Sequence, residues 1–97
     1  MIHEIVIQHV AADKRDEYLR VFGEFLRNAR YEGSHGIRLF AGVEDPARVI
    51  LMIEWDSVDS HTRHRGTAMH DAMKELTSQY QTEKSDGAHY LLHEVKT

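Results

Sequence analysis

The chain has 97 residues, enough for one domain, and a domain of this size buries only about two-thirds of the surface that its unfolded form exposes. Its 16 Asp and Glu against 12 Lys and Arg give a net charge of -4, and the lack of any basic block argues against a nucleic-acid partner. No cysteine is present, which excludes disulfides, thiolate metal sites and cysteine nucleophiles.

The beginning of the chain, MIHEIVIQHV, has no basic region followed by an apolar run. Nowhere does an apolar run reach the roughly 18 consecutive residues that a membrane span needs. We therefore expect a cytoplasmic protein without a membrane partner.

Residues 2–10 alternate between two sides with the period of two that is typical of a strand. Glu4 and Val6 fall on one side, and Ile5 and Ile7 fall on the other. Because both sides carry apolar residues, we expect both faces of this strand to be covered.

A helix over residues 14–30 is predicted next, with Asp13 as its N-cap. Its apolar side chains recur at the three- and four-residue spacing of one helical face: Tyr18, Phe22, Phe25, Leu26 and Ala29. The glycines of the following segment YEGSHG end this helix.

Two strands, at 37–42 and 48–55, are predicted to form a hairpin, because the turn segment VEDP with Pro46 lies between them. The first of them alternates apolar and other residues, and the second, RVILMIEW, is a dense β-branched and apolar run.

A second helix is predicted over about 58–80, with Ser57 as its N-cap and Gly66 as a point where it is interrupted or kinked. The polar turn TEKSDG then leads to a last strand, AHYLLHEV, at 88–95.

The order β-α-β-β-α-β predicts a single domain over residues 1–97 of the α+β class. It is a ferredoxin-like fold with a four-stranded antiparallel sheet and two helices on one face. The other face would be too apolar to remain in water, which favours a homodimer that pairs two sheets around an interior pocket. By this interpretation seven residues lie on that face: Val6, Arg38, Phe40, Ile50, Met52, Tyr90 and Leu92.

The stretch EGSHGIRLFAGVEDPARVILMIEWDSVDSHTRH resembles the antibiotic biosynthesis monooxygenase family of dimeric α+β barrels. The resemblance lies in the order and spacing of short motifs along nearly the whole chain. The first two motifs are a glycine before the second strand, Gly33, and a D-P-x-R turn formed by Asp45, Pro46 and Arg48. The others are E-W at the end of the third strand (Glu54 and Trp55), a serine at the helix start (Ser57) and a histidine nine residues after the tryptophan (His64).

The resemblance implies several activities. Some relatives oxidise quinols or phenolic aromatics with O2 and without any cofactor, whereas others degrade haem, isomerise sugar phosphates or have no known activity. In the haem-degrading branch a strand-one asparagine, a tryptophan and a histidine would stand where this chain has Val6, His64 and Lys74. These differences argue against haem, so we expect no cofactor.

For a cofactor-independent oxygenase, the resemblance makes His64 the candidate base, since imidazole titrates near neutrality. Arg38 or Tyr90 would stabilise the oxyanion. The alternatives stay open: His64 as a structural histidine, Arg38 as a solvated strand charge that pairs with Glu54, and Tyr90 as an interface residue.

The expected substrate pocket is lined by Val6, Phe40, Met52, Trp55 and Leu92. For Trp55, at the end of its strand, core packing is favoured over a role as a stacking platform for the substrate, because large aromatic side chains dominate core burial.

Metal binding is a further question, because His61 and His64 share a helical face at i and i+3. On a continuous helix His70 would lie about 600° beyond His64 and so well around the axis. Without a compact ligand motif, no physiological metal site is expected.

The sequence therefore predicts a small dimeric monooxygenase-like enzyme that acts on a quinol-like or other aromatic ligand. Two rivals remain: a non-catalytic barrel that binds a hydrophobic small molecule, and an isomerase or sugar-phosphate enzyme, which would need more cations in its pocket than Arg38 alone.

Overall fold

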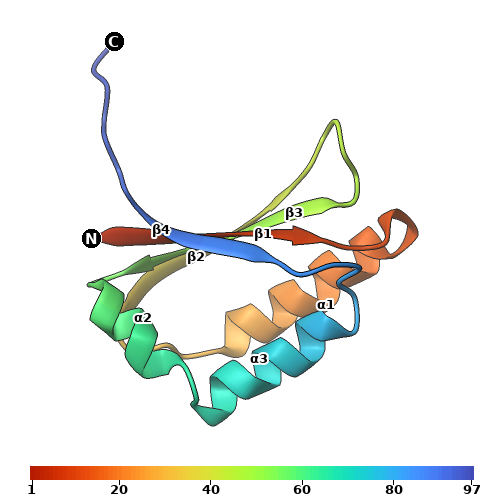
Figure 1. Ribbon diagram of the computed structural model, residues 1–97, viewed down its shortest axis with the longest axis horizontal. Coiled ribbons are helices and arrows are strands. Elements are labelled where there is room, and N and C mark those ends of the chain that lie inside the picture. Colours follow the sequence, from red (N-terminus) through yellow and green to blue (C-terminus); the bar gives the residue numbers. More distant parts are fainter.

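In the computed structural model, which describes residues 1–97, the chain forms one sheet with all its helices on one face (Figure 1). The elements in chain order are β1 (Ile2–His9), the short 3-10 turn η1 (Ala12–Lys14), α1 (Arg15–Asn28), β2 (Ser34–Ala41), β3 (Arg48–Trp55), α2 (Val58–His64), α3 (Ala68–Ser78) and β4 (Asp86–Leu91). The sheet is antiparallel throughout, with the strand order β2-β3-β1-β4. The predicted ferredoxin-like α+β fold is thus confirmed, and no helix is both long and apolar enough to cross a bilayer.

The interruption predicted at Gly66 is confirmed: the predicted second helix is divided into α2 and α3, which meet at an angle (Figure 1). The chain leaves α2 through Gly66, whose φ of 82° is a left-handed conformation that L side chains rarely adopt. Ser57 caps α2 as predicted, because its hydroxyl accepts a 3.2 Å hydrogen bond from the backbone N–H of Ser60. The hydroxyl of Thr67 caps α3 in the same way.

The N-cap prediction for the first helix is wrong. The turn η1 precedes α1, so that Lys14 and not Asp13 occupies the cap position, and no side chain caps this helix.

The hairpin strand β3 has the predicted bounds, whereas β1 ends one residue earlier than predicted, at His9, and β2 and β4 differ more. β2 begins at Ser34, before the predicted start, because a bulge between Ser34 and Gly36 lets pairing with β3 continue. β4 ends at Leu91, which pairs with Ile2 at the very start of β1. Beyond that point β1 offers no further residues, so the predicted extension to residue 95 has no partner strand.

The register of β1 corrects one predicted position. Val6 lies opposite Leu51, and directly opposed residues of an antiparallel pair point to the same face. Leu51 belongs to the buried face of β3, under the helices, so Val6 lies there too and not on the open face. Ile5 and Ile7, opposite Met52 and Ile50, take its place on the open face.

The core lies between the sheet and the helices. Ten apolar residues are buried there: Val10, Tyr18, Phe22, Leu26, Ala29, Tyr31, Val49, Leu51, Ile53 and Trp55. Polar side chains share this interior: the Tyr18 hydroxyl donates a 2.8 Å hydrogen bond to Oε1 of Gln8, and His61 is only 5% exposed. A carboxylate from β1 and further histidines join them, which makes one end of this interior polar.

Candidate functional site

A carboxylate on the helix-covered face of the sheet organises this polar interior. Oε1 of Glu4, in β1, accepts a 2.9 Å hydrogen bond from Nε1 of Trp55 at the end of β3. Oε2 of the same carboxylate lies 3.2 Å from Nε2 of His61 in α2. Both side chains of this second contact are well buried, at 13% and 7% exposure, so Glu4 is held from two elements at once.

Two histidines of helix α2 pack against Trp55. His61 and His64 are three residues apart and therefore share one helical face. The His61 ring stacks on Trp55 with 5.2 Å between ring centroids and 20° between planes, and the His64 ring lies 5.7 Å from Trp55. Tyr31 closes this aromatic cluster, with its ring 4.3 Å from that of His64.

The hydroxyl of Tyr31 stays protonated at neutral pH. Burial, assisted by the negative charge of Glu4, raises the pKa of Tyr31 to about 12. Its hydroxyl donates a 3.7 Å contact to Sδ of Met73 in α3. Tyr31 therefore contributes a ring and a donor to the site, and no charge.

Burial, together with the charges of Arg65, His89 and His70, lowers the pKa of His61 to about 4. His61 is therefore neutral near pH 7, and its contact with Glu4 joins a neutral ring to the carboxylate. Its other nitrogen, Nδ1, lies 2.7 Å from Nε2 of His89 in β4.

Burial also lowers the pKa of His64, with additional lowering from His70 and His61 and an opposing effect of Glu4. Nε2 of His64 is buried and has no hydrogen-bond partner in the protein. A buried polar atom without a partner is costly, and in a native structure it calls for an explanation such as a bound ligand.

His70 lies beside His64, with 5.4 Å between ring centroids. The prediction that His70 lies well around the axis of a continuous helix from His64 is therefore wrong. The break at Gly66 redirects the chain before α3 begins and returns His70 to the same cluster.

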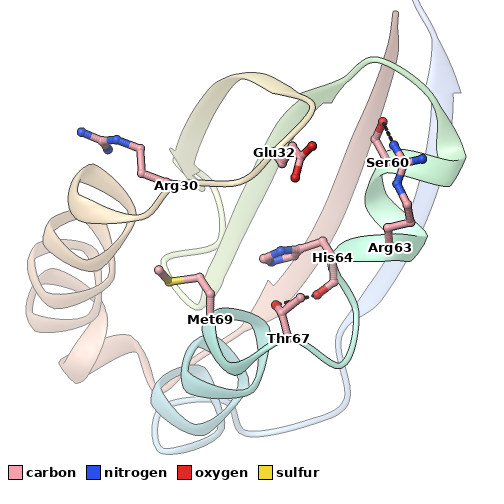
Figure 2. A pocket seen from close by; sticks show the side chains of 7 residues that line it. All are labelled: Arg30, Glu32, Ser60, Arg63, His64, Thr67 and Met69. Atoms are coloured by element: carbon pink, nitrogen blue, oxygen red, sulfur yellow. Dashed lines mark hydrogen bonds between the residues drawn. The ribbon is translucent and has the colours of Figure 1, made fainter.

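A cleft of about 530 Å³ opens at His64. Figure 2 shows the His64 ring reaching from the end of α2 into the space between Glu32 and Met69, while Arg63 turns back toward the Ser60 hydroxyl. The complete lining is Arg30, Glu32, Ser60, Arg63, His64, Thr67 and Met69.

A second cavity, of about 490 Å³, lies on the helix-covered face beside β4. It reaches Glu4, His61, Val6 and Leu51 at its floor, and His70 and Met73 come from α3. Its cationic lining residues are Arg65, Lys74 and Lys84.

The structure separates the three side chains predicted to act together. His64 lies under the helices, whereas Arg38 and Tyr90 lie on the open face, opposite Met52 and His3 in their ladders. The sheet stands between the two groups, so within one chain Arg38 and Tyr90 do not share a site with His64.

The open face has a cavity of its own, of about 410 Å³, to which Arg38, Met52, Tyr90 and Leu92 contribute. Phe40 lies on the same face and is 47% exposed. Glu54 pairs with His3 at 3.5 Å and makes no ion pair with Arg38, so the predicted cross-hairpin pair is absent.

Trp55 is 0% exposed, and it lines none of these cavities. The core interpretation of this residue is the one that the structure supports, because its ring is enclosed by Tyr31 and His61 and its N–H is used by Glu4.

Sequence reasoning missed Glu4, His61, Tyr31 and His89 as members of one cluster. One signal was available: Glu4 shares its side of the strand with Val6 and Gln8, so a covered strand implied a carboxylate in the interior. Such a group needs partners, and the nearby histidine-rich helix could supply them.

Nowhere do three or more His, Asp or Glu side chains converge in an arrangement that could hold a metal ion. The histidines instead contact one another and Glu4 through one hydrogen bond, between His61 and His89, and through a close polar contact and ring contacts.

A family model for antibiotic biosynthesis monooxygenases matches residues 1–76. Among solved structures, a protein from Bordetella bronchiseptica described as an antibiotic biosynthesis monooxygenase is 23% identical, with a TM-score of 0.86 over 95% of this chain and 96% of that one. One from Caulobacter crescentus with the same description is 17% identical, with a TM-score of 0.81 over 96% and 90%.

A variant of SnoaB, a cofactor-independent oxygenase from Streptomyces nogalater, is 11% identical and has a TM-score of 0.72 over 97% of this chain and 94% of its own. No curated protein matches the chain by sequence. At these identities, the solved structures establish the shared fold.

Proposed function

The chain belongs to the antibiotic biosynthesis monooxygenase family, and from this premise we propose that it is a cofactor-independent monooxygenase that oxidises a quinol or another phenolic aromatic with O2. The fold likeness to SnoaB, which is itself described as a cofactor-independent oxygenase, is consistent with this proposal. Because fold alone does not fix function, the residues of the site must support the activity.

The observation that carries the proposal is the unpartnered Nε2 of His64. Its lowered pKa favours the neutral ring at pH 7, and in the tautomer with the proton on Nδ1 this nitrogen is a bare acceptor. A base that is neutral at the working pH and lacks a protein partner is suited to take a proton from a bound hydroxyl.

The first step is then transfer of the hydroxyl proton of the substrate to Nε2 of His64, which leaves the electron pair on the oxygen. The resulting phenolate is far easier to oxidise by one electron than the neutral phenol, so it can reduce O2 directly. For an anthrone-like substrate, one oxygen atom replaces the two hydrogens of the reacting carbon and the other leaves as water. The rings of Trp55 and Tyr31 pack against the His64 ring and restrict its motion.

The open face of the sheet supports a homodimer as part of the proposal. Phe40 and Tyr90 are about half exposed there, at 47% and 51%, beside Met52 and Ile5. Pairing this face with that of a second copy would remove it from water. In this arrangement Arg38 and Tyr90 act at the interface and its cavity, away from His64.

One observation favours a second candidate, a binding protein or isomerase for a sugar phosphate or similar anion. The cavity beside β4 contains Arg65, Lys74 and Lys84, which is more positive charge than the sequence alone indicated for any pocket. This candidate predicts saturable anion binding without consumption of oxygen.

The test is oxygen uptake by metal-stripped protein with a panel of quinols and anthrone-like phenols. His64→Ala should lower kcat by roughly 10²- to 10⁴-fold, the range of a lost general base. His35→Ala is the matched control, because His35 is an exposed histidine paired with Asp56 outside the cluster. Uptake that survives in His64→Ala would remove His64 from the mechanism, and no uptake with any substrate would favour the second candidate.

A further inference from the structure

Three side chains from three elements form a continuous chain of polar contacts beside the second cavity. Glu4 in β1 contacts Nε2 of His61 in α2 at 3.2 Å, and Nδ1 of His61 contacts Nε2 of His89 in β4 at 2.7 Å. Glu4 and His89 are also direct cross-strand partners on the same face of the sheet. The sheet therefore fixes both ends of the chain, and α2 supplies its middle.

Chemistry orients the protons in this chain. A bare lone pair on Nε2 of His61 would be repelled by the Glu4 carboxylate 3.2 Å away, so the proton of the neutral ring resides on Nε2. The neutral His61 ring then has a bare Nδ1, which can only accept from Nε2 of His89. A neutral His89 with its proton on Nε2 has a bare Nδ1, so the chain ends in a proton acceptor.

That acceptor belongs to a residue that lines the cavity of about 490 Å³. Its cationic residues, Arg65, Lys74 and Lys84, face a single carboxylate, Glu4, which is already engaged by Trp55 and His61. The whole chain has a net charge of -4, whereas this cavity gathers three positive side chains. The cavity is therefore suited to bind an anion. The remaining titratable neighbours, His64 and His70, are histidines of the same cluster.

We propose that this cavity binds a ligand with an acidic hydroxyl, a phenol or an enol, and that His89 accepts its proton. The O–H bond of the ligand breaks, an N–H bond forms at Nδ1 of His89, and the electron pair remains on the ligand oxygen. Glu4 and His61 are positioning residues that hold His89 in the accepting tautomer, and Arg65, Lys74 and Lys84 stabilise the anion. The inference goes beyond the proposed function, because this cavity is separate from the cleft at His64, and ionisation of a ligand in it is measurable without turnover.

The probe is 4-nitrophenol, whose anion absorbs visible light and whose neutral form does not. Titrated into the protein without oxygen, at a pH where the free probe is mostly neutral, it should become ionised on binding. His89→Gln should weaken this binding about tenfold to a hundredfold, the value of a lost hydrogen bond to a charged group, and remove the visible band. Lys74→Gln should weaken binding and reduce the band, because a cation near the anion is lost.

The positioning role is tested by nitrogen NMR of the histidine rings. In the wild type, His61 and His89 should both carry their protons on Nε2. Glu4→Gln should mix the tautomers of both rings, since an amide can donate as well as accept, and it should weaken the visible band of the probe. His35→Gln is the control, because His35 pairs with Asp56 outside the cavity and should leave both readouts unchanged.

Failure of the probe to ionise on the wild type, or an equal band in His89→Gln, would overturn the inference. Unchanged His89 tautomers in Glu4→Gln would overturn the positioning role of Glu4 and His61. Absence of oxygen uptake with every quinol would instead refute the proposed function and leave the ionisation result standing, so the two failures are distinguishable.

Discussion

Nε1 of Trp55 donates a 2.9 Å hydrogen bond to Oε1 of Glu4, between residues 51 positions apart in the sequence. This bond uses one carboxylate oxygen and leaves the other for His61, at 3.2 Å. Burying a charge is costly unless it is hydrogen-bonded, so the N–H of the indole is part of what permits a carboxylate in this interior. Trp55 thereby links the packing of the core to the polar site.

Trp55→Phe should lower the free energy of unfolding by about 1–3 kcal/mol for the unpaired carboxylate oxygen, in addition to the loss of ring volume. The measurement is urea denaturation followed by circular dichroism, because Trp55 is the only tryptophan of the chain. In a Glu4→Gln background the same change should cost less, since the charge that needs the N–H is gone. Equal costs in both backgrounds would show that the hydrogen bond contributes nothing.

The free energy of unfolding should depend on pH through the protonation of His61. Its pKa is about 4 in the folded chain against 6.5 for an ordinary histidine, so between these values the unfolded chain binds more protons. The contribution of the neutral His61 to the free energy of unfolding is complete above pH 6.5 and is lost as the pH falls toward 4. It amounts to about 3 kcal/mol at most. The test is urea denaturation at a series of pH values, with His61→Gln beside the wild type. The difference between the two curves should flatten above pH 6.5, and a constant difference from pH 7 to pH 4 would contradict the prediction.

Three glycines should respond differently to alanine. Gly66→Ala should lower the free energy of unfolding by about 1 kcal/mol, because φ is 82° at this position. The loss stays small because no atom lies close to the new Cβ. Gly33→Ala should cost more, since φ is 86° and the Cβ would lie 2.8 Å from that of Ser60 in α2. Gly23→Ala, in open space within α1, should stabilise by roughly 0.5–1 kcal/mol. Chemical denaturation gives all three values, and equal costs at Gly66 and Gly33 would contradict the assigned clash.

The pattern of the sequence predicts the fold well where one signal dominates. The strand RVILMIEW lies between a proline turn and a serine cap, and its bounds are confirmed. The parity of β1 could not be assigned from its own residues, because both sides of it are partly apolar and only pairing with β3 puts Val6 beneath the helices. The end of β4 depends on the length of β1, which is a property of the sheet and not of the segment.

The site was less predictable because its contacts join distant segments. His64 and Trp55 were singled out through a family resemblance, whereas the partners that define their environment come from other elements. His61 and His89 are 28 residues apart, and no local pattern brings their rings within hydrogen-bonding distance. The break at Gly66 was foreseen as a kink, but its consequence, contact between His64 and His70, requires the actual path of the chain.

The open face of the sheet gives the last prediction, which concerns the proposed dimer. Phe40→Lys should raise the dimer dissociation constant at least tenfold, because the charge would have to be buried when two such faces pair. Val43→Lys is the control, since Val43 is 91% exposed between β2 and β3 and outside the face. Light scattering coupled to gel filtration measures the mass, and circular dichroism checks that each variant is folded, which it should be because Phe40 is outside the core. A wild-type protein that stays monomeric at all concentrations, or equal masses for Phe40→Lys and the wild type, would show that this face does not pair with a second copy.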